Sequence, residues 1–296
     1  MIGIIAQGRM GNQLFQYAFV YSNAKELDTS FFIDGYSSLH YFELYDGLQK
    51  ENKKNKLKYL ISNFFVSPNF RQKETSIRNM PAWLKEVFLH KKKVDWDIDF
   101  VETNDILPVI NNNAIYKGFF QSETYFKKYA KDIRQLFAIK KDYKDAFAKK
   151  FETLYTKKTI ALHIRRGDYV NFGAPELGGF DLTLPLSYYK KCLHLISNKE
   201  EYNIIFVSDD IEYVKTAFGE GENYFFESNS EIIDFQLLLN ADIQIVSNSS
   251  FSWWAAWLNE KTNKITYAPD YYLGFKVNTF FPTNIRVDDW NWVNVK

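Results

Sequence analysis

The sequence predicts an α/β protein in which two nucleotide-type domains with parallel sheets face one another. Three observations predict this fold class. The first 34 residues follow a pattern of strand, glycine loop, helix and strand, and from residue 159 apolar strand-like runs again alternate with helical patterns. The length of 296 residues fits two domains of ordinary size. A fresh buried strand begins at residue 159 after a lysine-rich turn, so we divide the chain into domains at 1–150 and 151–296.

The first half begins with a predicted βαβ unit. Residues 2–6 are an apolar strand, and the helix over 12–27 follows from the helical spacing of Leu14, Ala18 and Tyr21. The other segments expected here are a strand at 31–34, an irregular or helical insertion at 46–104, a strand at 114–120 and a largely helical segment at 123–151.

The second half repeats the alternation of strands and helices. The expected strands lie at 159–164, 203–207, 224–226, 243–247 and 264–268. The expected helices lie at 187–197, 211–218 and 232–239, and a fourth opens near Ser252. Parallel strands of this kind bind ligands beyond their carboxyl ends, so the functional residues are expected in the loops that follow the strands.

Composition and charge exclude several classes of protein. Apolar residues make up 46% and charged residues 25% of the chain, which is the balance of a globular protein. The formal net charge is +1, so no global field holds a nucleic-acid backbone, and we expect no nucleic-acid partner. Any anion site must therefore be local.

Nothing in the sequence indicates export or a membrane anchor. Cys192 is the single cysteine and cannot form an internal disulfide. Residues 1–5 lack the basic segment and long apolar run of a signal peptide or transmembrane segment. We therefore expect a cytoplasmic protein. The lysine runs between residues 50 and 93 leave open a peripheral contact with an anionic surface such as the inner membrane, with a solvated face as the alternative.

The segment His163-Ile164-Arg165-Arg166-Gly167-Asp168-Tyr169 lies at the carboxyl end of a predicted buried strand. Arginine offers a planar fork of donors that matches phosphate oxygens, so two adjacent arginines here indicate an anion site. A structural pair between arginine and aspartate at a domain edge is the alternative.

A second polar loop, residues 247–252, lies between a strand and an apolar helix. In one interpretation, its hydroxyls and the N-terminus of the following helix bind an anion, which the helix dipole attracts. In the other, Ser250 or Ser252 caps that helix and the tryptophans that follow belong to the core. The segment Ser208-Asp209-Asp210 allows the same two interpretations, because Ser208 or Asp209 is also suited to capping.

Other catalytic patterns are weak. The sequence has no Walker loop, no complete GxGxxG, no GxSxG and no histidine pair at metal spacing. Asp95-Trp96-Asp97-Ile98-Asp99 contains Asp-x-Asp twice, a pattern that holds a metal in some glycosyltransferases. It follows lysines 91–93 and no clear strand, so we expect no metal site.

Four motifs in order give the chain a resemblance to a known family. They are Gly8-Arg9-Met10-Gly11-Asn12-Gln13-Leu14-Phe15-Gln16-Tyr17-Ala18, then 163–169, then 208–210, then 247–254. In this order and position they resemble bacterial α-1,2-fucosyltransferases of glycosyltransferase family 11. The resemblance implies a GT-B-like fold of two facing Rossmann-type domains. It further implies GDP-β-L-fucose as donor substrate, no cofactor or metal, and inverting transfer to the 2-hydroxyl of a terminal galactose.

The resemblance also implies site residues. The donor would bind to the C-terminal domain, and the N-terminal domain would lie on the acceptor side. Arg165 would bind the pyrophosphate with His163 beside it, and Asp234, sixteen residues before Ser250, would read the guanine edge. The remaining residues implied to bind the donor are Ser249, Ser250 and Phe251 from the same pocket and Gly11 and Asn12 from across the cleft.

The expected chemistry places fixed positive charge at the β-phosphate, where negative charge develops as GDP departs. The residues expected to act in catalysis are Arg165, His163, Asn12 and Asp168. Inversion also needs a base, and Asp168 and Glu176 are near in sequence, but the sequence does not identify the base and Asp168 is better suited to orienting an arginine. Residues 178–181 differ from the family pattern in a loop that the resemblance implies would face the acceptor, so acceptor identity stays open, as does the oligomeric state. Two further hypotheses are a fucosyltransferase of another linkage and a nucleotide- or glycan-binding protein without transfer activity.

Overall fold

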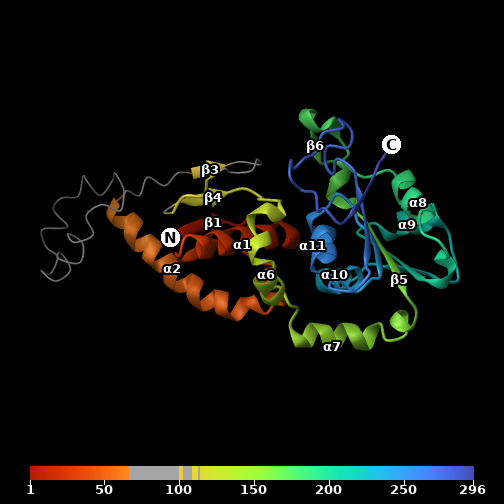
Figure 1. Ribbon diagram of the computed structural model, residues 1–296, viewed down its shortest axis with the longest axis horizontal. Helices are drawn as coiled ribbons and strands as arrows, with labels where there is room; N and C mark the ends of the chain where they lie inside the picture. The colour runs from red at the N-terminus through yellow and green to blue at the C-terminus, as the bar shows by residue number, and fades with distance from the viewer. Residues whose placement is uncertain (67–99, 103–108, 113) are drawn as a thin grey trace, which may run out of the picture.

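The computed structural model describes residues 1–66, 100–102, 109–112 and 114–296, and its strands form two parallel sheets in separate halves of the chain (Figure 1). A sheet of four strands is built from residues before 118, and a sheet of six strands from residues after 158. Helix α11 (Ser250–Leu258) lies between the two halves (Figure 1). The expected α/β class with parallel sheets is therefore confirmed.

The N-terminal sheet has the order β2-β1-β4-β3. Its central strand β1 pairs in parallel with β2 through helix α1, so the predicted βαβ unit is present. The sheet is formed by β1 (Ile2–Ile5), β2 (Phe31–Asp34), β3 (Phe100–Glu102) and β4 (Ile115–Lys117), with helices α1 (Met10–Glu26) and α2 (Leu44–Val66).

Helix α1 begins two residues earlier than the helical spacing predicted. Arg9 is its N-cap in extended conformation and makes no side-chain capping bond. Asn12 therefore lies within the first turn and is not the cap. The apolar spacing locates the buried face of a helix, but it does not show where the first hydrogen-bonded turn begins.

The C-terminal sheet has the order β9-β8-β5-β10-β11-β12, all parallel. Numbered along this half of the chain, that order is 3-2-1-4-5-6, which is the doubly wound dinucleotide-binding arrangement. The strands are β5 (Thr159–Ile164), β8 (Asn203–Ser208), β9 (Tyr224–Glu227), β10 (Ile243–Ile245), β11 (Ile265–Pro269) and β12 (Asn291–Val293). The strand order reverses between β5 and β10, so the ligand crevice is expected beyond the ends of these two strands.

The helices of this half begin close to the predicted positions, with different caps. Ser249 caps α11 by accepting from the Phe251 N–H, and Asp210 caps α9 by accepting from the Tyr213 N–H. The sequence had indicated neighbouring residues for both caps. The helices are α8 (Leu186–His194), α9 (Ile211–Phe218), α10 (Glu231–Leu239) and α11, and a short hairpin is formed by β6 (Gly173–Ala174) and β7 (Gly179–Phe180).

Residues 123–151 form separate short helices, so the prediction of one largely helical segment was only partly right. The segment contains α6 (Ala130–Leu136) and α7 (Lys141–Lys150). Between them Phe137 and Ile139 are each 2% exposed, and Ile139 pairs with Phe42 as an isolated bridge. Burial of this extended stretch ends α6. The short 3-10 helices of the described residues lie at 39–41, 123–125, 127–129, 154–156, 167–170, 175–177 and 199–201.

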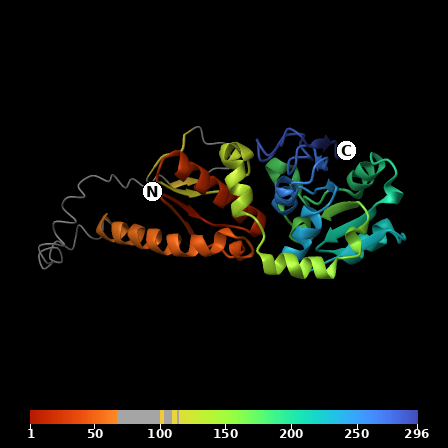
Figure 2. The same cartoon turned by 60° about the horizontal axis from the view of Figure 1, so that its bottom comes forward.

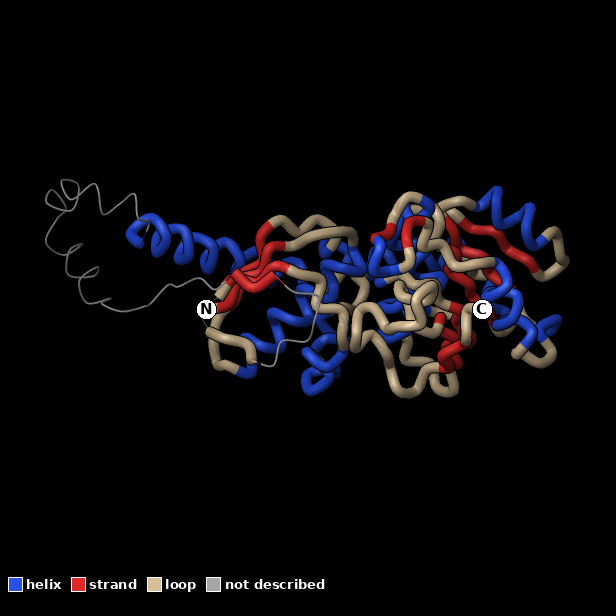
Figure 3. The backbone as a smooth tube through the Cα atoms, turned by 90° about the horizontal axis from the view of Figure 1, so that it is seen from above, coloured by secondary structure: helices blue, strands red, loops and turns tan. Residues whose placement is uncertain are grey.

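Aromatic packing joins the two halves. The Phe15 ring of α1 lies 4.6 Å from Trp253 and 4.9 Å from Trp254 of α11, measured between ring centroids. The Trp257 indole N–H donates to Glu123 at 3.2 Å. In Figure 3 the two strand-bearing regions lie on either side of this zone of helices and loops. The tryptophans of α11 therefore hold the N-terminal and C-terminal halves together.

The position of α7 bears on the division of the chain. This helix lies beneath the C-terminal sheet region in Figure 2, and the Gln236 amide of α10 donates to the Tyr143 carbonyl at 3.2 Å. Helix α7 thus packs on the C-terminal half although it lies within residues 1–150. The boundary near residue 150 stays a prediction.

Candidate functional site

A cavity of about 470 Å³ lies beyond the carboxyl ends of β1, β5, β8 and β10, where the two halves meet. Its walls come from both halves of the chain. The donor-binding and catalytic residues that the family resemblance implied all line this cavity: Gly11, Asn12, His163, Arg165, Asp168, Asp234, Ser249, Ser250 and Phe251. Because β5 and β10 are the pair at which the strand order reverses, the cavity lies where this fold binds its ligands.

Arg165 is the most firmly held cation of the cavity wall. Its side chain is 14% exposed, and its two terminal nitrogens pair with Asp168 and Asp209. The guanidinium carbon also lies 5.4 Å from the centre of the Tyr169 ring. Two carboxylates and an aromatic ring thus fix the orientation of the fork, which is the preorganisation needed to stabilise a developing negative charge.

Arg166 faces away from the cavity. Its guanidinium carbon lies 3.4 Å from the Tyr213 ring centre, and its Nε donates to Asp210 at 3.0 Å. The sequence had predicted an anion site formed by both arginines. In the structure Arg165 lines the cavity, whereas Arg166 contacts Asp210 and Tyr213 at the start of α9.

His163 is buried and uncharged. It is 5% exposed, and its Nδ1 lies 2.8 Å from the Ser247 hydroxyl. Burial, reinforced by the charge of Arg165, lowers the pKa of His163 to about 3. The ring therefore stays neutral near pH 7 and acts as a hydrogen-bonding group beside Arg165 without adding positive charge.

The start of α11 contacts the start of α1 directly. The Ser250 hydroxyl donates to Asn12 Oδ1 at 2.9 Å, and the Gln121 amide donates to the same oxygen at 2.8 Å. A Cβ added to Gly11 would lie 2.5 Å from the Ser250 carbonyl carbon. Gly11 therefore permits a backbone approach that any side chain would prevent, and both Gly11 and Ser250 line the cavity.

Asp234 faces the cavity and accepts hydrogen bonds from one loop residue. Its carboxylate accepts from the Asn229 backbone N–H at 3.1 Å and from the Asn229 side chain at 3.0 Å. Burial raises the pKa of Asp234. The carboxylate is thus positioned with the loop that precedes α10, on the cavity wall beside Phe251, whose ring lies 5.3 Å from His163.

The sequence analysis missed two charged residues of the cavity. Glu231 opens α10, its pKa is raised by burial, and its carboxylate accepts from the Met10 N–H at the start of α1. Arg9 lies 3.7 Å from Asp168 across the cavity with 71% of its side chain exposed. Arg9 belongs to the first of the four sequence motifs, and that motif could have indicated it. No sequence pattern indicates Glu231, because only the folded chain brings α10 beside α1.

Comparison with known proteins identifies the family. The sequence profile of Glycosyl transferase family 11 matches residues 1–274. This chain belongs to glycosyl transferase family 11. The family resemblance inferred from the four motifs is therefore confirmed.

Two relatives from Escherichia coli support this assignment of the family 11 protein. The chain is 30% identical over 287 residues to the O-antigen biosynthesis glycosyltransferase WbnK, covering 88% of this chain and 91% of that one. It is also 30% identical over 290 residues to an alpha-1,2-colitosyltransferase, covering 93% of both. The chain is accordingly a glycosyltransferase.

A solved structure supports the fold of the family 11 protein. The crystal structure of POFUT1 in complex with GDP-fucose matches with a TM-score of 0.50 at 11% identity, covering 90% of this chain and 96% of that chain. At this identity the similarity concerns the fold alone. It confirms the expected GT-B-like arrangement of two facing Rossmann-type domains.

Within the described residues no group of three or more His, Cys, Asp or Glu side chains could hold a metal ion. The Asp-x-Asp patterns at 95–99 and lysines 91–93 lie outside those residues. No helix in the described ranges combines the length and the apolar character needed to cross a bilayer.

The two carboxylates considered as catalytic base differ in position. Asp168 lines the cavity and pairs with Arg165, as expected of a group that orients the arginine. Glu176 is exposed in the 3-10 helix at 175–177 and does not belong to the cavity wall. Neither position is that of an unpaired carboxylate facing the cavity.

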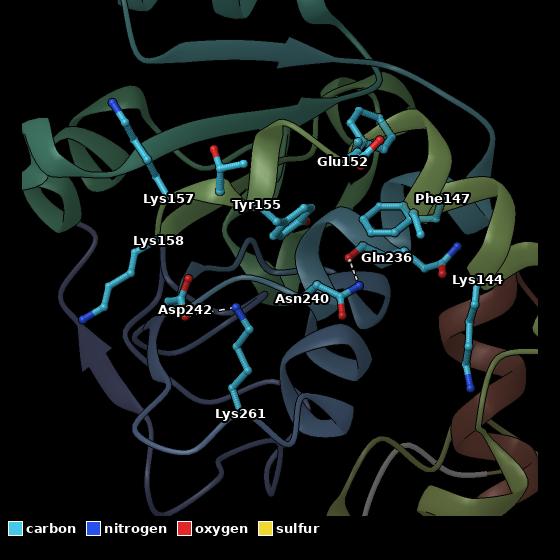
Figure 4. Close-up of a pocket in the computed structure, with 13 residues that line it drawn as sticks. Lys144, Phe147, Glu152, Tyr155, Lys157, Lys158, Gln236, Asn240, Asp242 and Lys261 are labelled. Carbon is cyan, nitrogen blue, oxygen red and sulfur yellow. Dashed lines mark hydrogen bonds and ion pairs between the residues drawn. The ribbon is translucent and has the colours of Figure 1, made fainter.

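A second hollow, of about 820 Å³, lies at the opposite ends of β5 and β10 (Figure 4). Lysine and aromatic side chains surround it, among them Lys158, Tyr155 and Phe147, and Lys261 pairs with Asp242 at 3.0 Å. It contains none of the motif residues. Since ligands of doubly wound sheets bind at the carboxyl ends of the strands, we assign the functional site to the smaller cavity.

Proposed function

We propose that this glycosyltransferase transfers L-fucose from GDP-β-L-fucose to the 2-hydroxyl of a terminal galactose in an oligosaccharide or glycan precursor, with inversion to an α-1,2 linkage. The observation that carries the proposal is the convergence of Arg165 with Asn12 and Gly11 on one cavity at the point of strand reversal. The alpha-1,2-colitosyltransferase relative supports the linkage. GDP-fucose as donor is what the resemblance of the motifs implies.

In the proposed reaction the acceptor oxygen forms a bond to fucose C1 while the bond from C1 to the β-phosphate oxygen breaks. The electron pair of that bond leaves with GDP, and the acceptor proton passes to a base. In this proposal Arg165, which lines the cavity, meets the β-phosphate, and its fixed fork stabilises the added charge without a metal ion. His163 is neutral and adds a hydrogen bond, and Asn12 contacts the donor from the opposite half.

Asp234 and the residues that follow β10 take the nucleotide in this proposal. Asp234 accepts hydrogen bonds from the guanine edge, and Phe251 gives the pocket an aromatic wall. Ser249 and Ser250 lie at the N-terminus of α11, where the helix dipole favours an anionic group. The C-terminal half would thus hold the guanine and the diphosphate, while Asn12 contacts the donor from the other half.

The test is incubation of the purified chain with GDP-fucose and a panel of galactosides, with and without EDTA, followed by linkage analysis of the products. We expect α-1,2-linked fucose and undiminished turnover in EDTA. Release of GDP with a product of another linkage would reject the proposed linkage. Loss of activity in EDTA would reject the metal-independent mechanism. Binding of GDP without any transfer would favour a nucleotide-binding protein.

A second candidate is transfer of colitose. It is favoured by the relative named as an alpha-1,2-colitosyltransferase, which aligns over 93% of both chains. The same assay with GDP-colitose distinguishes the two donors. A kcat/KM for GDP-colitose above that for GDP-fucose would replace the proposed donor sugar and leave the proposed site unchanged.

A further inference from the structure

The cavity wall carries little positive charge for a site that would hold a diphosphate. Among the described residues that line it, Arg9 and Arg165 are the cations. The carboxyl groups of the same wall belong to Asp168, Asp209, Glu231 and Asp234. Arg165 already pairs with two of these carboxylates. A diphosphate carries more than one negative charge, so it needs a second cation, and Arg9 is the one that this wall offers.

Arg9 is brought to the cavity by the turn that follows β1. Gly8 adopts a φ of +72°, in the left-handed region, and a Cβ there would lie 2.3 Å from the Asn12 amide nitrogen. The chain then enters α1 with Arg9 as the N-cap. The Arg9 side chain makes no capping hydrogen bond, and 71% of it is exposed. The fold therefore presents this guanidinium at the cavity without using it to hold the helix.

Asp168 links the two arginines across the cavity. One of its carboxylate oxygens pairs with Arg165, and the other lies 3.7 Å from Nη2 of Arg9. The Asp168 side chain is 54% exposed, so its ion pair with Arg9 is both long and open to water. Such a pair contributes little stability and separates easily. Two guanidiniums, one from each half of the chain, thus already lie on either side of a single anionic group.

We propose that Arg9 is a second donor-binding arginine, whose guanidinium leaves Asp168 and binds the diphosphate from the N-terminal wall, opposite Arg165. This inference rests on the proposed function. The exchange replaces an ion pair that is open to water with a charge-assisted contact, in which the planar fork of Arg9 donates to phosphate oxygens. Arg9 therefore supplies part of the affinity for the phosphates and none of the affinity for the base.

The experiment measures binding of GDP by calorimetry and of guanosine, which lacks phosphates, by an NMR titration. For Arg9→Gln we expect the Kd for GDP to rise about 10-fold or more, on the scale of one hydrogen bond to a charged group. The Kd for guanosine and the Tm should stay as in the wild type, and Arg9→Lys should recover part of the affinity for GDP. Arg286→Gln is the matched control, because this exposed arginine lies over the Phe280 ring outside the cavity. An unchanged Kd for GDP in Arg9→Gln, or equal losses for GDP and guanosine, would overturn the inference.

A double-mutant cycle with Asp168→Asn separates a direct contact from an indirect one. If Arg9 binds the diphosphate itself, Arg9→Gln should weaken GDP binding by a similar factor in the Asp168→Asn background. If that loss disappears in this background, Arg9 acts only through Asp168, and the inference is wrong.

A transfer assay with GDP-fucose and lactose separates this inference from the proposed function. If GDP binding depends on Arg9 and yet the wild type transfers no fucose, the second arginine stands and the proposed function fails. If the wild type transfers fucose and Arg9→Gln binds GDP and transfers fucose equally well, the second arginine fails and the function stands. A wild type that does not bind GDP would overturn both.

Discussion

The C-terminal half supplies the cavity with charged side chains at the ends of β5 and β8, two strands whose six residues are all buried. The N-terminal half supplies the start of one helix, whose cation Arg9 is largely exposed. Arg165 is fixed by two carboxylates, whereas Gly11 contributes only its close approach to Ser250. The C-terminal half therefore provides a fixed charge at the cavity, and the N-terminal half provides the opposite wall. Five substitutions or measurements test this division.

The largest effect is expected at Arg165. Arg165→Lys keeps the charge and loses the fork, so turnover should fall roughly 100-fold or more, as for the loss of one preorganised donor. Arg166→Lys is the matched control, because Arg166 packs on Tyr213 outside the cavity. Steady-state kinetics on both variants decides the point. Equal rates for Arg165→Lys and the wild type, with unchanged melting, would remove Arg165 from the mechanism.

Asp234 tests whether the C-terminal half also selects the base. Asp234→Ala should weaken GDP binding about 10-fold or more with a smaller change in kcat, because a base contact is present in ground and transition states alike. Calorimetry with inosine diphosphate, which lacks the guanine amino group, sharpens the test. The wild type should prefer GDP, and the variant should lose that preference. A variant that still prefers GDP would show that Asp234 acts only on the Asn229 loop.

Gly11→Ala tests the contribution of the N-terminal half. The new methyl group would meet the Ser250 backbone at 2.5 Å, so we expect a loss of about 1–3 kcal/mol in unfolding free energy together with reduced turnover. Gly47→Ala is the control, since Gly47 lies in helix α2 with open space around it and alanine favours a helix. Denaturant unfolding of both variants provides the measurement. A Gly11→Ala protein as stable and active as the wild type would mean that the close approach is dispensable.

The buried His163 gives the C-terminal half a dependence on pH. Its pKa is lowered from 6.5 to about 3 in the folded state, so the stability gained from neutral His163 is present above pH 6.5 and is lost as the pH falls below it. Between pH 7 and pH 5 this single group should remove about 2 kcal/mol of unfolding free energy. His163→Gln should flatten that slope, whereas His194→Gln, at an exposed position, should retain it. Parallel slopes for His163→Gln and the wild type would contradict the assignment.

The smallest effect is expected at Asn12. Asn12→Ser should lower the unfolding free energy by about 1 kcal/mol, because the shorter hydroxyl no longer accepts from Ser250 and Gln121. It should also lower turnover about 10-fold, because the amide contact with the donor is lost. Turnover equal to the wild type would limit Asn12 to packing. A structure with bound GDP in which Asn12 lies beyond direct or single-water reach of the diphosphate and fucose would contradict its proposed role.

Much of the fold followed from the sequence because its signals are local. The apolar run 159–164 and the helical spacing after residue 12 each depend on neighbours within a few residues, and both elements are present. The interruption at Phe137 and Ile139 was missed because it depends on burial against Phe42, about 95 positions away. Helix α2 lay within a stretch predicted only as irregular or helical, since lysines interrupt its apolar pattern.

The sequence by itself determined which residues follow the strands, and it therefore brought Arg165 and the Ser249–Ser250 pair into consideration. Only the tertiary structure decided that Arg165 enters the cavity while Arg166 packs on Tyr213, and that Glu231 reaches the start of α1. The physical reason is that the direction of a side chain at the end of a strand depends on the residues with which it pairs, and these lie far away in the chain. The Asp209 and Asp210 carboxylates, more than forty positions after the arginines, each pair with a different one of them.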